Sequence, residues 1–199
     1  MVRVQLEDRG IQDSRILEAM RSVPRHEFVA EEFRDRAYDD HPLPIGCDQT
    51  ISQPFMVGLM LMLMAREGAD RVLEVGTGSG YMTALLSTLC AEVYSIERHA
   101  ELAASAEQRL VRLGYANVKI KIGDGALGWP EFAPYDSIVV SAAAAEVPPA
   151  LFAQLREDRR MVVPVGPAST QNLQVVRKVN GQQVVTTVLG CRFVPLVEE

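Results

Sequence analysis

The stretch VLEVGTGSGY, residues 72–81, decides the fold of this chain. Its apolar start reads as a buried strand, and the glycines Gly76, Gly78 and Gly80 follow where a helix begins. Glycine lets the backbone bend sharply and approach a ligand without a Cβ atom in the way. The GxGxG spacing differs from the GxGxxG fingerprint of dinucleotide sites, so the glycines alone indicate only a nucleotide-like ligand.

Two carboxylates extend this pattern to the next strands of the chain. Glu97 closes the strand Glu92–Glu97, where a carboxylate can accept both hydrogen bonds of a ribose diol. Asp124, between Gly123 and Gly125, ends the third strand and falls near the adenine end of the same cleft. Each feature alone fits a plain turn or a solvent-facing acid. Together they indicate one nucleoside site, for NAD or for S-adenosylmethionine.

Strand-like and helix-like segments alternate along the chain, which is typical of an α/β protein. We expect a Rossmann-like, doubly wound and mostly parallel sheet of seven strands that ends in an antiparallel hairpin with its turn at Asn180-Gly181. The predicted strands are Arg71–Val75, Glu92–Glu97, Val118–Ile122, Tyr135–Ser141, Met161–Val165, Leu173–Val179 and Gln182–Leu189. The predicted helices between them run from the glycine turn through Leu89, over Ala100–Leu113 and over Pro149–Leu155.

A helical extension and a loop precede this sheet. Apolar residues at helical spacing stop at Pro24, and a second, short helix is expected around Phe28–Phe33. The segment Tyr38–Gln53 has no period and contains two prolines, so it reads as an ordered loop, of the kind that often carries function. Pro54 then suits the first turn of a helix with an apolar face.

Composition limits the class of protein. The 199 residues fit one domain, with residues 1–53 as extension and loop and residues 54–199 as the Rossmann-like core. With 48% hydrophobic residues, 23% charged residues and a net charge of −6, the chain resembles a globular protein that does not bind nucleic acid. It has no signal-peptide pattern and no apolar run near the ~20 residues of a membrane span. We therefore expect a cytoplasmic protein without a membrane or nucleic acid partner.

The remaining reactive side chains predict no metal centre and no nucleophilic triad. The three cysteines lack the spacing of a zinc site or a disulfide framework. They are Cys47, Cys90 and Cys191. The three histidines lie apart in the sequence and read as structural or solvated. They are His26, His41 and His99.

Several motifs resemble one known family over nearly the whole chain. The glycine stretch is shared by many methyltransferases, whereas PLPIG at 42–46 followed by TISQP at 50–54 is specific. On these residues the chain resembles the protein-L-isoaspartate (D-aspartate) O-methyltransferases, within the class I S-adenosylmethionine-dependent methyltransferases. The other matching motifs are RHEFV (25–29), AYDDHPLPIG (37–46), QTISQP (49–54), GDG (123–125), VPVG (163–166) and RFVPL (192–196).

The resemblance implies S-adenosyl-L-methionine as cofactor, S-adenosyl-L-homocysteine as its product, no metal, and a set of site residues. Ser52 matches the family's active-site serine, and Glu97 and Asp124 match its ribose and adenine ligands. The implied cofactor-binding residues are Gln49, Thr50, Ile51, Ser52, Gly76, Thr77, Gly78, Ser79, Gly80, Glu97, Asp124 and Gly125. The implied substrate-binding residues are Asp40, Pro42, Leu43, Ile45, Thr50, Ser52, Val194 and Pro195.

The implied reaction is methyl transfer to the carboxylate of L-isoaspartyl and D-aspartyl residues in damaged proteins and peptides, which starts repair through a succinimide. A carboxylate with a pKa of about 4 is already ionised at pH 7, so no general base is required. The task is to desolvate and orient it, and Ser52 can contribute by hydrogen bonding. Without the resemblance, Ser52 reads rather as a helix cap before Pro54.

Three departures from the family pattern keep other functions open. Asp48 stands where the family usually has glycine, and its carboxylate could repel an anionic substrate or restrict the backbone. Ala145 and Asp158-Arg159 replace a proline and a Gly-Gly turn and should alter only loop stiffness.

The alternative functions are a methyltransferase for another carboxylate or small molecule, a non-catalytic cofactor-binding module, and a nicotinamide oxidoreductase. The last is disfavoured by the GxGxG spacing and by the lack of a Tyr-x-x-x-Lys pair. We expect a monomer.

Overall fold

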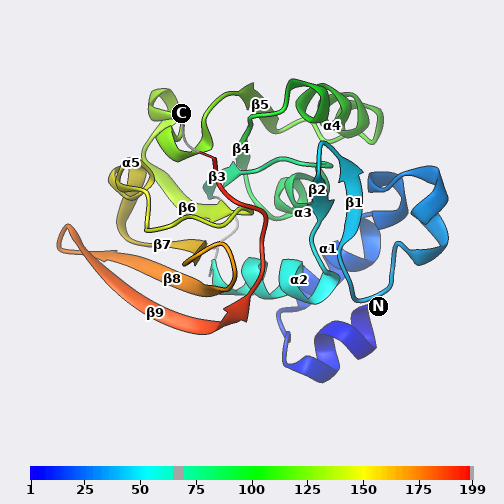
Figure 1. The fold of residues 1–199 in the computed structure, drawn as a ribbon, viewed down its shortest axis with the longest axis horizontal. Coiled ribbons are helices and arrows are strands. Elements are labelled where there is room, and N and C mark those ends of the chain that lie inside the picture. The colour runs from blue at the N-terminus through cyan, green and yellow to red at the C-terminus, as the bar shows by residue number, and fades with distance from the viewer. Residues whose placement is uncertain (65–69, 198–199) are drawn as a thin grey trace.

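A computed structural model describes residues 1–64 and 70–197 and places a seven-stranded sheet between two layers of helices (Figure 1). Residues 65–69 and 198–199, the last two of which end the predicted core, lie outside this description. The strands of the sheet are β3 (Arg71–Val75), β4 (Glu92–Glu97), β5 (Val118–Ile122), β6 (Tyr135–Val140), β7 (Leu155–Val165), β8 (Gln171–Val179) and β9 (Gln182–Cys191). The helices are α1 (Ser14–Ser22), α2 (Pro54–Leu63), α3 (Tyr81–Leu89), α4 (Ala100–Arg112) and α5 (Pro149–Gln154).

The sheet has the order β5-β4-β3-β6-β7-β8-β9. Strands β3 to β7 pair in parallel, and β8 and β9 add an antiparallel hairpin at one edge. Asn180 and Gly181 have φ values of 52° and 72°, as a two-residue hairpin turn with left-handed geometry requires. The predicted fold class and the predicted hairpin are therefore confirmed.

The central strands bury side chains on both faces of the sheet. Along β3, Val72 belongs to the core shared with α1, α2 and α3, while Leu73 and Val75 belong to a second core on the opposite face, under α5. This alternation follows from the two-residue period of a strand. Because both faces are covered, the strand reads as a continuous apolar run in the sequence.

The N-terminal extension differs from its prediction in one detail. The expected short helix around Phe28–Phe33 is two separate 3-10 turns, η3 (Arg25–Phe28) and η4 (Glu31–Arg36). Val29 and Ala30 between them are extended, with φ values of −122° and −64° and ψ values near 160°, so no helix can continue through them.

The segment expected to be an ordered loop contains a small hairpin. Strands β1 (Leu43–Gly46) and β2 (Gln49–Ile51) form their own antiparallel two-stranded sheet. The turn between them places Gly46, Cys47 and Asp48 at φ values of 95°, 50° and 56°. Strands of three and four residues are too short to show a period in the sequence, which is why the pattern predicted a loop.

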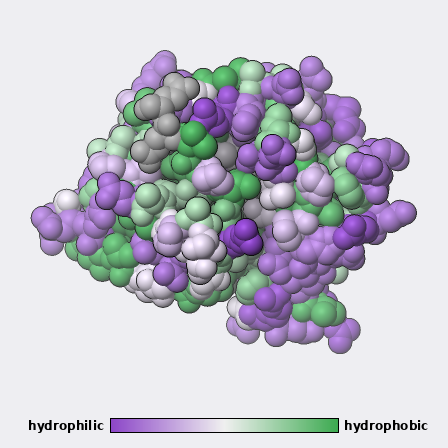
Figure 2. All heavy atoms as spheres, viewed as in Figure 1, coloured by the Kyte–Doolittle hydropathy of each residue, from purple (hydrophilic) through white to green (hydrophobic). Residues whose placement is uncertain are grey.

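Strand β7 begins six residues earlier than the expected Met161, at Leu155. Residues 156–160 near its start are five charged residues at or near the surface. Because they are polar, the sequence does not reveal that the strand extends beyond the buried centre of the sheet. Seen from the same direction as in Figure 1, the surface has polar side chains over much of the N-terminal extension and apolar side chains over β9 (Figure 2). Among the described residues, no helix has the length and apolar character to cross a membrane.

Candidate functional site

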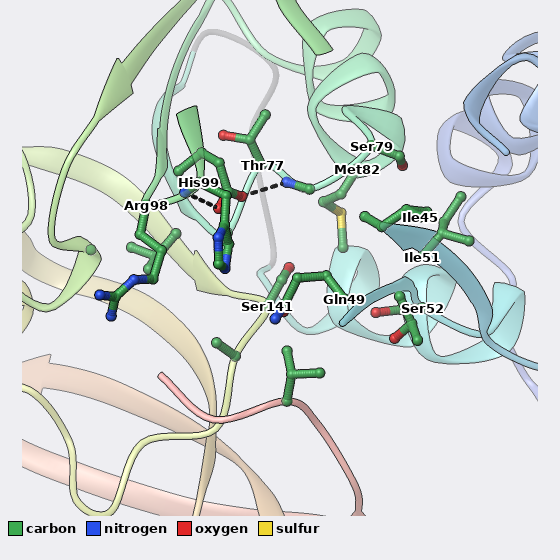
Figure 3. A pocket seen from close by; sticks show the side chains of 18 of the residues that line it. Ile45, Gln49, Ile51, Ser52, Thr77, Ser79, Met82, Arg98, His99 and Ser141 are labelled. Atoms are coloured by element: carbon green, nitrogen blue, oxygen red, sulfur yellow. Dashed lines mark hydrogen bonds between the residues drawn. The ribbon is translucent and has the colours of Figure 1, made fainter. Parts of the chain in front are cut away.

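The carboxyl ends of β3, β4 and β6 meet at the point where the strand order reverses. The chain leaves β3 for β4 on one side and later returns to β6 on the other side. In open α/β sheets such a switch point forms the binding crevice. A cavity opens here, with about 970 Å³ of empty space including its mouth, between these strand ends, the β1–β2 hairpin and the C-terminal segment 194–197 (Figure 3).

The glycine turn after β3 forms one wall of this cavity. Gly76 and Gly78 have φ values of 93° and 53°, in the left-handed region that glycine tolerates best. A Cβ atom on Gly78 would lie 3.2 Å from the Ile45 side chain. Gly80, with a φ of 86°, does not line the cavity; a Cβ atom there would lie 3.3 Å from Ala106, so it serves the packing of α3 against α4.

Glu97 is fixed at the cavity wall by the backbone. Its side chain is 5% exposed; one carboxylate oxygen accepts a hydrogen bond from the Gly78 amide at 2.8 Å and the other from the His99 amide at 2.9 Å (dashed lines in Figure 3). A carboxylate oxygen has two lone-pair sites, so each oxygen can still accept a ribose hydroxyl. This carboxylate and the glycine turn that it holds fit the ribose of a nucleoside cofactor.

Asp124 has a structural partner beside the cavity. Its carboxylate accepts a hydrogen bond from the Ala126 amide at 2.8 Å and caps the 3-10 turn η5 (Gly125–Leu127), and its side chain is not part of the cavity lining. Gly125 does line the cavity, and a Cβ atom at this position would lie 2.3 Å from Val75. The glycine is therefore required by close packing under the cavity floor.

The β1–β2 hairpin brings the QTISQP motif to the opposite wall. Gln49, Thr50, Ile51 and Ser52 all line the cavity, and Gln49 extends towards Ser141 at the end of β6 (Figure 3). Ser52 does not act as a helix cap, because the N-cap of α2 is Gln53 and no side-chain hydrogen bond caps this helix.

Arg25 of the RHEFV motif holds this loop from behind. It is fully buried and donates to the backbone oxygens of Ala37 (2.7 Å) and Ser52 (2.8 Å). Burial lowers the pKa of its guanidinium, which lies over the Tyr81 ring at 4.8 Å. The motif thus fixes the backbone at Ser52 without entering the cavity.

The substrate-binding residues implied by resemblance divide into two groups. Ile45, Thr50, Ser52, Val194 and Pro195 line the cavity. Asp40, Pro42 and Leu43 do not: Asp40 accepts from the Gln53 side chain (2.8 Å) and the Phe55 amide (3.1 Å), Pro42 is exposed, and Leu43 belongs to the core. These three residues support the loop instead of lining the cavity.

Comparison with known proteins agrees with this geometry. The family model described as Protein-L-isoaspartate(D-aspartate) O-methyltransferase matches residues 1–199. The chain belongs to this family. Two similar relatives are the protein-L-isoaspartate O-methyltransferases of Opitutus terrae, 54% identical over all of this chain and 86% of the relative, and of Koribacter versatilis, 53% identical over 99% of this chain and 89% of the relative.

Solved structures of the isoaspartate methyltransferase family share the fold. One, 31% identical, superposes with a TM-score of 0.90 over all of this chain and 66% of the longer solved chain. A second, the β-aspartate methyltransferase of Plasmodium falciparum in complex with S-adenosyl-L-homocysteine, is 27% identical, with a TM-score of 0.86 over all of this chain and 97% of its own.

Sequence reasoning missed several residues on the cavity wall of this isoaspartate methyltransferase. His99, interpreted as structural or solvated, lies two residues after Glu97 and lines the cavity. Ser141 directly follows β6, the fourth strand of the sheet along the chain, so the pattern that selected Glu97 and Asp124 could also have selected it. Met82 and Ile96 line the cavity as well, but an apolar residue gives no signal that separates it from core packing.

Asp48, the departure from the family pattern, lies at the tip of the β1–β2 hairpin and is exposed. It does not line the cavity. Its φ of 56° lies in the left-handed region that favours glycine, and aspartate is among the residues that tolerate such a backbone. Of the two effects expected for Asp48, the backbone effect is the one that the structure supports.

No group of three or more potential metal ligands occurs among the described residues.

Proposed function

We propose that this chain transfers the methyl group of S-adenosyl-L-methionine to the side-chain carboxylate of L-isoaspartyl and D-aspartyl residues in damaged proteins and peptides. The observation that carries the proposal is one cavity in which the ribose-type carboxylate Glu97 and the glycine turn face Ser52 and its neighbours in the QTISQP motif. Membership of the isoaspartate methyltransferase family supports the choice of acceptor.

The cofactor would be held by the glycine turn, by Glu97 and by Gly125. When bound, it supplies an electrophilic methyl group on a sulfonium. Glu97, already held by two backbone amides, is oriented before any ligand arrives, so little free energy is needed to arrange it. We assign Asp124 an indirect role: it fixes the 3-10 turn that begins with Gly125.

The acceptor carboxylate needs orientation and the removal of water. Ser52 is the candidate hydrogen-bond donor to this carboxylate, and the Arg25 contact to the Ser52 carbonyl holds the backbone in place. Ile45, Ile51 and Val194 surround the same cavity with apolar surface, which lowers the local dielectric constant around the acceptor. Because the carboxylate is ionised at neutral pH, none of these residues has to remove a proton.

The repair step that follows needs no residue of this chain. The methyl ester can expel methoxide, whereas a carboxylate would have to expel an oxide, so the neighbouring backbone nitrogen attacks the ester carbonyl. The C–N bond forms, the C–OCH3 bond breaks, and the methoxide leaves as methanol with the proton from the backbone N–H. The resulting succinimide takes up water and opens partly to normal aspartate.

We infer further that the protein works as a monomer in the cytoplasm, with damaged proteins and peptides as its partners. All three cysteines are free thiols, which fits a reducing compartment. Light scattering of the purified protein tests the oligomeric state directly.

A methylation assay with matched peptides tests the proposed function. The two peptides have one sequence and differ only in an L-isoaspartyl or a normal L-aspartyl residue. We expect methyl incorporation into the isoaspartyl peptide alone, and a strong loss of incorporation with Ser52→Ala. Equal incorporation into both peptides, or into neither, would contradict the choice of acceptor.

A further inference from the structure

Glu74, the acidic residue inside VLEVG, is a carboxyl group in the middle of the core. It is 0% exposed, on the central strand β3. One of its oxygens accepts hydrogen bonds from the Thr83 hydroxyl at 2.6 Å and the Ser95 hydroxyl at 2.7 Å. Its other oxygen is buried and has no hydrogen-bond partner among the described residues. Burying a carboxyl group with an unpaired oxygen costs free energy, so its presence in the core needs an explanation.

The hydrogen bonds of Glu74 lead to the cofactor turn. Ser95 lies beside Glu74 in the parallel register of β3 and β4. Its hydroxyl also lies 2.6 Å from the hydroxyl of Thr77, which belongs to the glycine turn and lines the cavity. The second branch, through Thr83, reaches only helix α3. Glu74 is thus two hydrogen bonds away from the cavity through Ser95.

The surroundings of Glu74 favour its neutral form. Burial raises the pKa of this carboxyl to about 8, and the charge of Glu97 acts in the same direction, while the Thr83 and Ser95 hydrogen bonds oppose the shift. Three neighbours of Glu74 are uncharged. They are Thr83 on α3, Ser95 on β4 and Val139, which lies in register with Glu74 on β6. A neutral carboxyl places no second negative charge near the ribose-binding Glu97.

We propose that Glu74 is a positioning residue of the cofactor site, which holds Thr77 and the glycine turn in place through Ser95. The inference rests on the proposed function in one respect, that the cavity at the glycine turn binds the cofactor. It explains why a carboxyl group occupies the core at this position. It also predicts that the Ser95 branch matters for ligand binding and that the Thr83 branch matters only for stability.

Calorimetric binding of S-adenosyl-L-homocysteine to four single variants of the full chain tests this inference. Glu74→Gln keeps the shape and neutrality of the side chain, so its affinity should stay within about twofold of wild type at pH 7 and should not change up to pH 9.5. Glu74→Leu and Ser95→Ala should each bind about five- to tenfold more weakly, the loss expected for one hydrogen bond.

Thr83→Val is the matched control, because it removes the other hydroxyl partner of the same oxygen. It should lower the unfolding temperature and leave the affinity within about twofold of wild type. If Glu74→Leu does not fold, the affinities of Ser95→Ala and Glu74→Gln still test whether Glu74 supports ligand binding through Ser95. Wild-type affinity for Ser95→Ala, or a Glu74→Gln affinity as weak as that of Ser95→Ala, would overturn the inference. Binding of the product analogue does not depend on the acceptor, so a failed isoaspartyl assay leaves this test intact.

Discussion

Replacing Glu74 by glutamine should remove a pH dependence of stability that wild type carries. In the unfolded chain this carboxyl ionises near its usual value of 4.5, whereas burial raises its pKa to about 8 in the folded protein. Between these values the folded state keeps a proton that the unfolded state releases. Unfolding therefore releases a proton, and the stability of wild type falls as the pH rises through this window.

The size of the effect follows from one proton over the chosen pH range. Each pH unit inside the window costs about 1.4 kcal/mol of stability, so two units, from pH 5 to pH 7, cost about 2.7 kcal/mol. Glu74→Gln cannot ionise at this position, so its free energy of unfolding lacks this pH-dependent contribution. Glutamine also changes the hydrogen bonding to Thr83 and Ser95, but that change shifts its stability by the same amount at every pH and leaves the slope unaffected.

Urea unfolding of both proteins at half-unit steps from pH 5 to pH 7 gives the two free-energy curves. The other titrating groups are common to both proteins, so the difference between the curves isolates Glu74. We expect Glu74→Gln to gain about 2.7 kcal/mol relative to wild type across this range. Parallel curves would show that Glu74 is ionised in the folded protein and would refute the reasoning.

Three further predictions concern the cavity wall. Glu97→Ala should weaken S-adenosyl-L-homocysteine binding at least tenfold, because hydrogen bonds to a charged group contribute about 1.5–3 kcal/mol; unchanged calorimetric affinity would rule out the ribose role. Ser52→Ala should lower turnover of an isoaspartyl peptide about tenfold while cofactor affinity stays within twofold. A variant with full turnover would have no need of the hydroxyl. Asp48→Gly should change the unfolding free energy by no more than about 1 kcal/mol and leave the peptide KM unchanged. A large fall in KM would show that the Asp48 carboxylate reaches the substrate after all.

The sequence predicted the centre of the fold well, because strong local signals coincide there. Strands β3, β4 and β5 begin and end at the expected residues. Apolar runs, a glycine turn and right-handed connections leave few other arrangements. Glu97 could be placed on the cavity wall for the same reason, since the end of a parallel strand has a known position relative to its neighbours.

Features that depend on the alignment of distant residues could not be predicted. The Glu74 network requires the register that places Ser95 beside Glu74, and nothing in either strand alone specifies it. Asp124 and Gly80 were selected from motifs, but the place of Asp124 depends on a 3-10 turn and that of Gly80 on the packing of α3 against α4. His99 was not selected as a site residue because its charged neighbours in the sequence suggested solvent, whereas the turn after β4 places it on the cavity wall.

The cofactor turn and the QTISQP loop together form the active site of an isoaspartate methyltransferase. A chromatographic time course of one isoaspartyl peptide with the protein and S-adenosyl-L-methionine follows the whole repair reaction. We predict that the isoaspartyl peptide is consumed and that succinimide and normal aspartyl peptide appear. Without the cofactor the peptide should stay unchanged, and with Glu97→Ala its conversion should be slower at a cofactor concentration that does not saturate the variant. An isoaspartyl peptide that persists in the presence of the wild-type protein and cofactor would show that this site does not methylate isoaspartyl residues.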